Sequence, residues 1–171
     1  MLDDYKKGVE LIKSFEGIED GNPKTVNLDP YLCPAGRWTI GWGHVVLDKN
    51  GCQIIGASNK QAAYRVYPKG ITLREAEELL QEDAGKTVVA IEKYVNVELN
   101  NNQKSALLSF VYNIGVGNLL SSTLLKLLNQ GKYLLVPGQI QRWNKVNGSV
   151  SKGLVRRRAA EANLWSSDVL Y

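Results

Sequence analysis

The stretch TLREAEELLQEDAGKTVVAIEKY (residues 72–94) carries the clearest structural signal in the chain. It opens with Thr72 and Glu75, the capping box in which an N-cap hydroxyl and a glutamate three residues later satisfy each other's backbone N–H groups. One apolar stripe then follows at helical spacing: Leu73, Ala76, Leu80, Ala84, Val88 and Ile91. This pattern predicts one long helix that ends near Tyr94.

The chain before this helix predicts a small lobe that contains β-structure. An apolar face over residues 3–16 indicates a helix that stops at Gly17. Residues 17–34 are rich in turn formers and predict irregular chain, whereas residues 37–44 (RWTIGWGH) alternate and predict one strand with glycines that admit a close approach to the backbone. Residues 45–69 predict short strands or loops with a turn at Asn50-Gly51.

The chain after the long helix predicts a helical lobe. Helices are expected over 100–113, 122–130 and 153–165, and Pro137 is expected to break the chain before Trp143. The fold class is therefore α+β and mainly α. We expect one catalytic domain over 1–171, with a β-containing lobe at about 17–70, a connecting helix at 72–94, and a helical lobe at 95–171 on which the 3–16 helix packs. A cleft between such lobes would suit an extended ligand.

Composition narrows the chemistry. Of the 171 residues, 44% are hydrophobic and 22% are charged, which is typical of a globular protein, and no apolar run reaches the roughly 20 residues that span a bilayer. The N-terminus lacks the apolar stretch of a signal peptide, so we expect a cytoplasmic origin. Cys33, Cys52 and the only histidine, His44, do not form a metal-ligand spacing. We therefore expect no metal and no cofactor, and chemistry based on carboxylates, hydroxyls, a thiol or arginine.

Positive charge is concentrated near the C-terminus. The chain has 21 basic and 17 acidic residues, yet residues 141–158 hold six bases and no acid: Arg142, Lys145, Lys152, Arg156, Arg157 and Arg158. Such a segment can attract a polyanion, either nucleic acid or an anionic cell envelope. The alternative is a solvated helix start with internal ion pairs.

Three side chains are candidates for catalysis. Glu16 ends the first helix, where the helix dipole disfavours a carboxylate. Two explanations are open: Glu16 is a proton donor, or it is an ordinary surface glutamate that tolerates this position. Thr39 lies on the glycine face of the expected strand and either holds a water or a sugar hydroxyl or simply favours the strand. Cys33 is either a small buried residue or a nucleophile. His44 is expected to be a structural hydrogen-bonding residue.

Several segments together resemble the phage-type lysozymes, the endolysins related to the T-even phage enzyme. These segments are LIKSFEG (11–17), YLCPAGRWTIGWGH (31–44), NQKSALLSFVYNIG (102–115), SSTLL (121–125) and GLVRRRAAE (153–161). Their order and position agree over nearly the whole chain. The resemblance implies the fold outlined above and hydrolysis of the β-1,4 bond between N-acetylmuramic acid and N-acetylglucosamine in peptidoglycan, for host-cell lysis.

The resemblance also implies roles for single residues. Glu16 matches the family's general acid, and Thr39 matches the threonine that helps to place the attacking water. Cys33 occupies a position where members carry aspartate or, in a subset, cysteine. Arg156 matches the arginine that pairs with the catalytic glutamate, although its basic neighbours leave the register open. His44, Asn113 and Trp143 are expected to support the site or to line the cleft.

The chain departs from the family pattern between Glu16 and Cys33, where 16 residues form a longer gap. Asp20 and Asp29 lie in or beside this insertion, and either could supply the carboxylate that Cys33 does not. Cys33 itself could orient a water, attack the sugar or only shape the site. The family expectation is inversion, whereas direct attack by Cys33 would give retention.

Other readings remain open at this point. They are a peptidoglycan-binding protein without turnover, a lytic transglycosylase that leaves anhydro ends, and, with the weakest support, a nucleic-acid binder. We expect peptidoglycan strands as the partner, with envelope contact through the basic segment, no nucleic acid, no transmembrane segment and a monomer. The enzyme would wait in the host cytoplasm until a membrane lesion lets it reach the wall. Pairing of Cys33 with Cys52 after release stays open.

Overall fold

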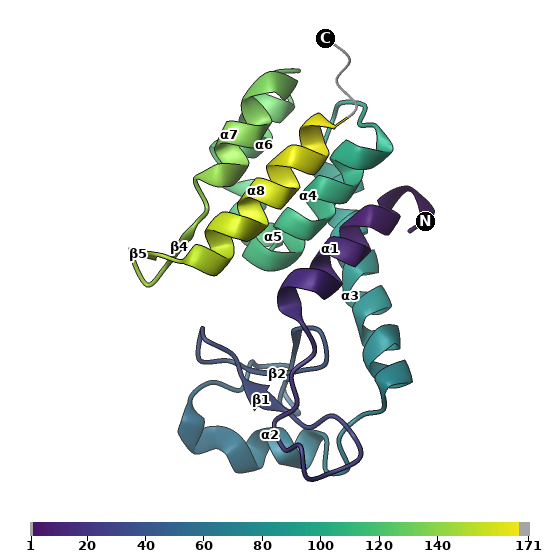
Figure 1. The fold of residues 1–171 in the computed structure, drawn as a ribbon, viewed down its shortest axis with the longest axis vertical. Coiled ribbons are helices and arrows are strands. Elements are labelled where there is room, and N and C mark those ends of the chain that lie inside the picture. Colours follow the sequence, from purple (N-terminus) through teal and green to yellow (C-terminus); the bar gives the residue numbers. More distant parts are fainter. Residues whose placement is uncertain (1, 168–171) are drawn as a thin grey trace. The chain divides into compact units, whose positions relative to one another are not determined.

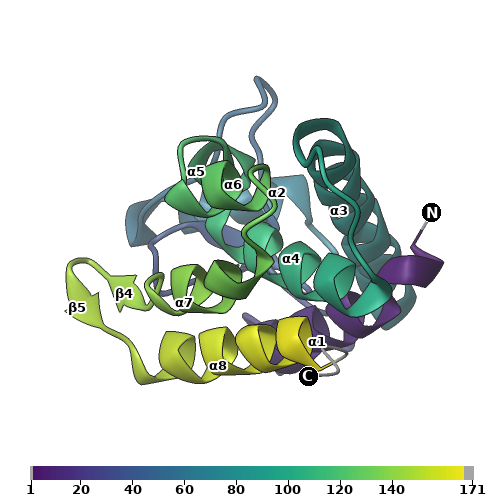
Figure 2. The same cartoon turned by 90° about the horizontal axis from the view of Figure 1, so that it is seen from above.

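The computed structural model describes residues 2–167, and they are mainly helical (Figures 1 and 2). The chain divides into two compact units, which we call the β-containing unit (Glu16–Asp83) and the helical unit (Met1–Phe15 with Ala84–Tyr171). Helix α3 (Leu73–Tyr94) contributes residues to both units. Among the described residues, no helix combines the length and the apolar character that crossing a membrane requires.

The β-containing unit holds a three-stranded antiparallel sheet of β1 (Tyr31–Leu32), β2 (Trp38–Ile40) and β3 (His44–Val45). Thr39 is paired with Tyr31 on one side and with Val45 on the other. The prediction of one strand through His44 is therefore wrong, because the chain turns at Gly41 and Gly43, which have φ values of +60° and +80°. The prediction that 17–34 is irregular holds except at β1.

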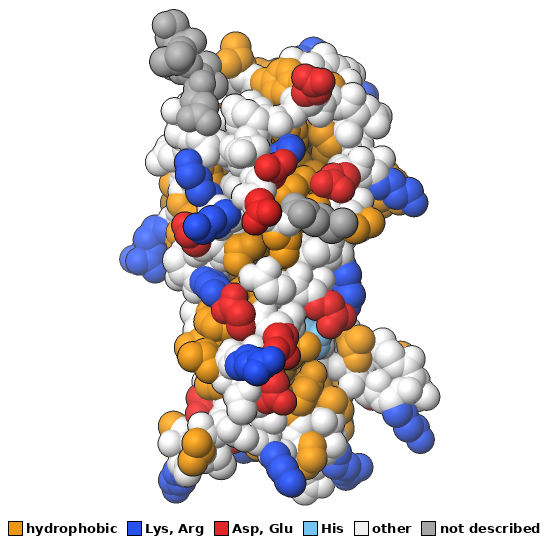
Figure 3. All heavy atoms as spheres, turned by 90° about the vertical axis from the view of Figure 1, so that its right-hand side faces the viewer, with side chains coloured by type: hydrophobic (Ala, Val, Ile, Leu, Met, Phe, Trp, Pro, Cys, Tyr) orange, Lys and Arg blue, Asp and Glu red, His pale blue; other side chains and the backbone are white. Residues whose placement is uncertain are grey.

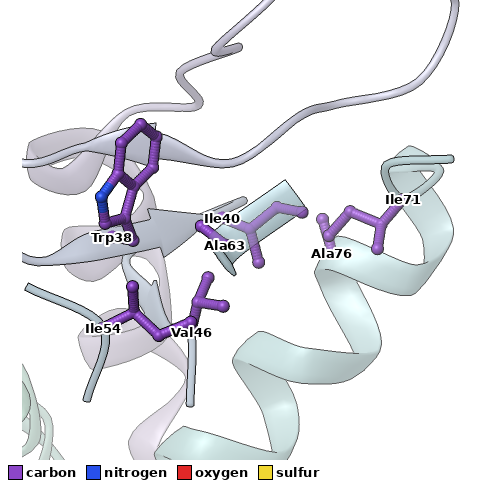
Figure 4. Close-up of a cluster of buried hydrophobic side chains, with 7 residues drawn as sticks. All are labelled: Trp38, Ile40, Val46, Ile54, Ala63, Ile71 and Ala76. Atoms are coloured by element: carbon purple, nitrogen blue, oxygen red, sulfur yellow. The ribbon is translucent and has the colours of Figure 1, made fainter. Parts of the chain in front are cut away.

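A hydrophobic core lies beneath this sheet (Figure 4). It joins side chains from the sheet, the chain that follows it, α2 and the start of α3: Trp38, Ile40, Val46, Ile54, Ala63, Ile71 and Ala76. Helix α2 (Lys60–Val66), preceded by the 3-10 turn η2 (Ala57–Asn59), was missed by the sequence prediction of strands or loops over 45–69. The predicted turn at Asn50-Gly51 is confirmed by the bond from the Gly51 N–H to the Asp48 carbonyl, 3.0 Å long.

Helix α3 begins as its capping box predicts. The Thr72 N–H donates to Glu75 Oε2 at 2.7 Å, and the Glu75 N–H donates to Thr72 Oγ1 at 3.2 Å. The predicted stripe is buried at Ala76, Leu80, Ala84, Val88 and Ile91, whereas Leu73 is exposed. The carboxylate that accepts from Thr72 has a pKa held below its usual range by those backbone and hydroxyl bonds.

The helical unit is built around α4 (Asn101–Ile114), which contacts α8 (Lys152–Ser166) and the 3-10 turn η1 (Asp3–Tyr5) that leads into α1 (Lys6–Glu16). A capping box of Asn100 and Gln103 opens α4, and Leu107, Leu108 and Phe110 are fully buried within it. The predicted helices over 100–113 and 153–165 are thus confirmed. The helix predicted over 122–130 is confirmed as the shorter α6 (Thr123–Leu128).

The remaining elements of the helical unit lie between α4 and α8. They are α5 (Val116–Leu120), the 3-10 turn η3 (Tyr133–Leu135), α7 (Val136–Gln141) and a two-stranded hairpin of β4 (Lys145–Val146) and β5 (Ser149–Val150). The prediction that Pro137 breaks the chain is wrong, because Pro137 lies in the first turn of α7, where no helical bond needs its missing N–H. Helix α5 and the β4–β5 hairpin were not predicted.

Candidate functional site

Glu16 is the last residue of α1, and its carboxylate lies against the turn between β2 and β3. A Cβ added at Gly43 would be only 3.1 Å from Glu16 Oε2. A glycine is therefore favoured at position 43 for two reasons: the backbone φ there is +80°, and a side chain would crowd the Glu16 carboxylate. The predicted close approach to the strand glycines is confirmed here. At Gly41 the approaching group is instead Ala76 Cβ, which would lie 3.0 Å from a Cβ added there.

Thr39 and Cys33 belong to the two strands beside this turn. Thr39, in the middle of β2, is 4% exposed, and its Oγ1 donates to the Tyr31 carbonyl at 3.4 Å. Cys33 directly follows β1 and is half-buried with a free thiol. Its N–H donates to the Arg37 carbonyl at 2.9 Å, so the sheet fixes its backbone.

Tyr31 connects these candidates, and the sequence analysis did not single it out. Its phenol donates to the Gly41 carbonyl at 3.5 Å, and its backbone carbonyl accepts the Thr39 hydroxyl at 3.4 Å. Burial raises the pKa of the Tyr31 phenol, and the nearby carboxylates of Glu19 and Glu16 raise that pKa further. Tyr31 therefore bonds Thr39 through its backbone and the turn after β2 through its phenol. Its place two residues before Cys33 was the signal available in the sequence.

His44 connects the sheet to α3. Its Nδ1 lies 2.7 Å from Asp83 Oδ2, and the two side chains are 20% and 22% exposed. This contact agrees with the expected hydrogen-bonding role of His44. Asp83 lies 39 residues further along the chain, and nothing in the local pattern pointed to it.

The two aspartates of the inserted loop, between Glu16 and Cys33, accept hydrogen bonds from residues of the same loop. Asp20 Oδ1 accepts the backbone N–H groups of Asn22 and Asp29, each at 3.0 Å. Asp29 is 5% exposed, and its Oδ2 accepts the Thr25 hydroxyl. The loop is also joined to the entry of α3 by a β-bridge between Leu28 and Ile71. These bonds favour a structural role for both carboxylates over the catalytic role that the sequence left open.

In the helical unit, two of the three consecutive arginines are buried. The Arg157 Nε donates to Glu161 Oε1 at 3.1 Å, and Arg158 Nη1 donates to Glu161 Oε2. Ser109 Oγ donates to the same carboxylate at 2.7 Å. Glu161 is fully buried, so this network holds two of the six bases that the sequence grouped as a patch in the interior.

Asn113 and Trp143 are placed around Arg158. The Arg158 guanidinium donates to Asn113 Oδ1 and, through Nε, to the Trp143 carbonyl at 2.9 Å. The Trp143 indole packs edge-on against Phe110, with ring centroids 6.0 Å apart. Both residues therefore support α8 from within the helical unit. Arg156, in contrast, is exposed on α8, and its pairing with Glu16 stays a prediction.

The structure gives further limits on the chemistry. Within residues 2–167, no group of three or more His, Cys, Asp or Glu side chains could hold a metal ion. Cys33 and Cys52 are both free thiols, and Cys52 is exposed. A cavity of about 400 Å³ in the helical unit is lined by residues that include Tyr5, Glu92 and Lys104, but by none of the candidate catalytic residues.

Comparison with known proteins agrees with this arrangement. The chain is 37% identical over 158 residues to an endolysin of Bacillus phage B103, an alignment that covers 92% of this chain and 52% of that protein. It thus spans about half the length of the Bacillus phage endolysins that it matches.

Two solved structures are similar over almost their whole length. The endolysin of Escherichia coli O157:H7 phage FAHEc1 is 33% identical, with a TM-score of 0.71 and coverage of 97% of this chain and 94% of that one. The muramidase domain of SpmX from Asticaccaulis excentricus is 32% identical, with a TM-score of 0.68 and coverage of 92% and 93%. The family model described as phage lysozyme matches residues 14–161, which include Glu16, Cys33, Thr39 and the buried arginine network. The chain therefore belongs to the phage lysozyme family.

Proposed function

We propose that this chain is a muramidase that hydrolyses the β-1,4 bond between N-acetylmuramic acid and N-acetylglucosamine in bacterial peptidoglycan. One observation carries the proposal. The Glu16 carboxylate lies against Gly43, the Thr39 hydroxyl bonds the Tyr31 carbonyl, and the free thiol of Cys33 directly follows β1, all within the β-containing unit. Glycosidic bonds are hydrolysed by an acid at the leaving oxygen together with a water or nucleophile at the anomeric carbon, and this set of groups can provide both.

Glu16 acts as the general acid in this mechanism. Its carboxyl group is half-buried and held against Gly43, so it can give a proton to the departing sugar oxygen as the bond breaks. Cleavage leaves positive charge on the sugar ring, and the carboxylate that remains after proton transfer stabilises that charge.

Thr39 and Cys33 hold the attacking water in this mechanism. Thr39 is fixed by the sheet, and its hydroxyl has a second lone pair available to accept from a water. Because Asp20 and Asp29 are occupied by bonds within their own loop, we assign the neighbouring position to Cys33. Water attack inverts the anomeric configuration, and the proton that the water loses passes to solvent. NMR of the first product distinguishes this from direct attack by the thiol, which would give retention and contradict the assignment.

Glu16→Gln tests the proposal most directly. The amide cannot donate an acidic proton, so turnover on purified peptidoglycan should fall by at least about 100-fold while the fold is kept. Glu10→Gln is the matched control, because Glu10 is exposed on the same helix. Equal turnover in both variants would show that Glu16 is not the acid.

Product analysis separates the two other readings. A lytic transglycosylase would leave 1,6-anhydro ends that are lighter by one water in mass spectrometry, and a protein that only binds the wall would release no soluble muropeptides. Hydrolysis predicts free reducing ends in the wild type and their loss in Glu16→Gln.

Because peptidoglycan lies outside the cell membrane, an enzyme made in the cytoplasm needs a route to it. We propose that the protein reaches peptidoglycan after the host membrane has been permeabilised and that it acts as a monomer. The exposed bases near the C-terminus support contact with the anionic envelope. The relatives also include proteins named SAR-endolysin, for example from Enterobacteria phage P21.

A further inference from the structure

The cavity of the helical unit takes no part in the proposed hydrolysis. Its volume of about 400 Å³ is in the size range of small-ligand sites. Its walls come from η1, the end of α3, the chain over 95–100 and the start of α4, all within one unit. On the face drawn in Figure 3, acidic side chains lie beside hydrophobic ones, and the cavity combines the same two types.

The charged groups of the cavity leave an excess of negative charge. Lys104 Nζ lies 2.7 Å from Asp4 Oδ2, and this contact lowers the pKa of Asp4, so both groups are ionised and their charges cancel. Glu92 and Glu98 also line the cavity and are exposed. Among residues 2–167, neither of these two carboxylates has an ion-pair partner. Two negative charges are therefore available to a cation.

The end of helix α3 adds to this preference for a cation. The Asn96 N–H, which would continue the helix by bonding the Glu92 carbonyl, donates instead to Asn129 Oδ1 at 2.8 Å. The last carbonyls of a helix form the negative end of its dipole and stabilise a cation nearby. The base of the last turn, Lys93, has its ammonium over the Tyr94 ring, 5.1 Å from the centroid.

The phenol of Tyr5 is a polar group of the cavity that lacks a partner. Tyr5 is 2% exposed, and no hydrogen bond within residues 2–167 involves its hydroxyl. Among the described side chains, only Tyr64 has a fully enclosed polar atom without a partner, so the Tyr5 hydroxyl is open to the cavity. Burial raises the pKa of Tyr5 to about 12, and the charge of Glu92 raises it too. The protonated phenol can still accept a hydrogen bond.

The remaining wall is apolar and consists of Ile91, Val95, Val97 and Leu99. A small inorganic cation would gain nothing from such a wall. A wholly apolar ligand would remove water from the carboxylates without replacing its hydrogen bonds, which is unfavourable. A ligand that joins an ammonium group to a short methylene chain suits both parts of the cavity.

We propose that this cavity binds a terminal alkylammonium group. The ammonium donates to the Tyr5 hydroxyl and to the carboxylates of Glu92 and Glu98, and the methylenes pack against the apolar wall. Lysine side chains of peptides and free aliphatic diamines share this chemistry. The inference concerns a second site and is independent of the proposed function.

Isothermal titration calorimetry of the full chain with n-alkylammonium ions tests the proposal. Each methylene that enters the apolar wall should tighten binding by about fourfold. The n-pentylammonium ion should therefore bind about 16-fold more tightly than n-propylammonium, and pentanoate, which has the opposite charge, should not bind. Equal affinity for the two ammonium ions, or binding of pentanoate, would overturn the proposal.

Variants of the polar groups test the position of the ammonium. An exposed ion pair is worth about threefold in affinity, so Glu92→Gln/Glu98→Gln should weaken n-pentylammonium binding by about tenfold. Tyr5→Phe keeps the ring and should weaken binding by about fivefold. Unchanged binding by either variant, with thermal melts showing that it is folded, would contradict the proposed site.

Glu10→Gln/Glu78→Gln is the matched charge control. It removes two carboxylates from exposed positions outside the cavity and should leave n-pentylammonium binding within about twofold of the wild type. Weakening equal to that of Glu92→Gln/Glu98→Gln would show that net charge alone attracts the ligand, and would overturn the proposal.

Two further ligands distinguish the sources of the ammonium. If N-acetyl-lysine amide binds as tightly as n-butylammonium, the cavity accepts a lysine side chain; if only 1,5-diaminopentane binds, the ligand is a free diamine. Either result supports the site, whereas failure of every alkylammonium ion to bind the wild-type chain excludes it. Turnover of Glu92→Gln/Glu98→Gln on purified peptidoglycan should equal that of the wild type. An inactive wild-type chain would contradict the hydrolase proposal without affecting the titrations.

Discussion

Replacement of Gly43 by alanine tests whether the carboxylate of Glu16 works from its place against the β2–β3 turn. The left-handed φ of +80° costs a residue with a Cβ about 1–2 kcal/mol. For a chain of 171 residues, this lowers the melting temperature by about 2–8 °C. The new Cβ would also stand 3.1 Å from Glu16 Oε2, so the carboxylate has to move by a few tenths of an ångström.

The catalytic cost follows from that displacement. A misplacement of about 1 Å at a reacting group costs about 100-fold in rate. A third of that displacement, in proportion, costs about fivefold. Gly43→Ala should therefore lower turnover on purified peptidoglycan by about fivefold, measured as released reducing ends at a temperature well below the melting transition.

Gly51→Ala supplies the control for backbone strain. Gly51 has nearly the same φ, +77°, and also lies in a tight turn of the β-containing unit, but no atom lies within 4 Å of its added Cβ. This variant should lose similar stability and keep full turnover. If Gly43→Ala is as active as Gly51→Ala at equal stability loss, the carboxylate does not act from its position beside Gly43, and the reasoning fails.

Three further changes test other parts of the structure. Glu161→Gln removes the buried carboxylate that Arg157 and Arg158 both bond, so chemical denaturation should show a loss of about 3–5 kcal/mol in the free energy of unfolding. Tyr31→Phe removes the hydroxyl that donates to the Gly41 carbonyl in the turn against which Glu16 lies, and steady-state kinetics should show a lower kcat with little change in KM; unchanged kcat would limit Tyr31 to packing. Burial raises the pKa of Tyr5 to about 12, so the unfolded state ionises first and stability falls as the pH rises from 10 toward 12. Tyr5→Phe should make that fall shallower in melts across this range, and an unchanged pH profile would contradict the assignment.

Local pattern was sufficient to predict most of the helices. The capping box at Thr72 and the stripe after it predicted α3 because both signals depend on neighbours within one or two turns. The end of strand β2 at Ile40 was harder to predict from the sequence. Alternation of tryptophan and glycine fits an extended strand as well as a turn, and only pairing with β3 decides between them.

Contacts between distant segments could not be read from local pattern. The glycines after β2 predicted a close approach but not that Glu16 would be the approaching group. The pair of His44 and Asp83 likewise depends on how α3 packs beneath the sheet. The arginine run was different, since Glu161 follows Arg157 and Arg158 at helical spacing and could have indicated that these two face inward.

The inserted loop between Glu16 and Cys33 offers a site at which a label can be attached. Its base is tied by Asp20 and by the bridge from Leu28 to Ile71, while Val26 at its tip is fully exposed. Loop tips of this kind tolerate added sequence, because no buried backbone bond has to be broken. An epitope or a dye-accepting tag placed at Val26 would therefore give a labelled protein whose folding is unaltered, suitable for imaging where it settles on a bacterial cell.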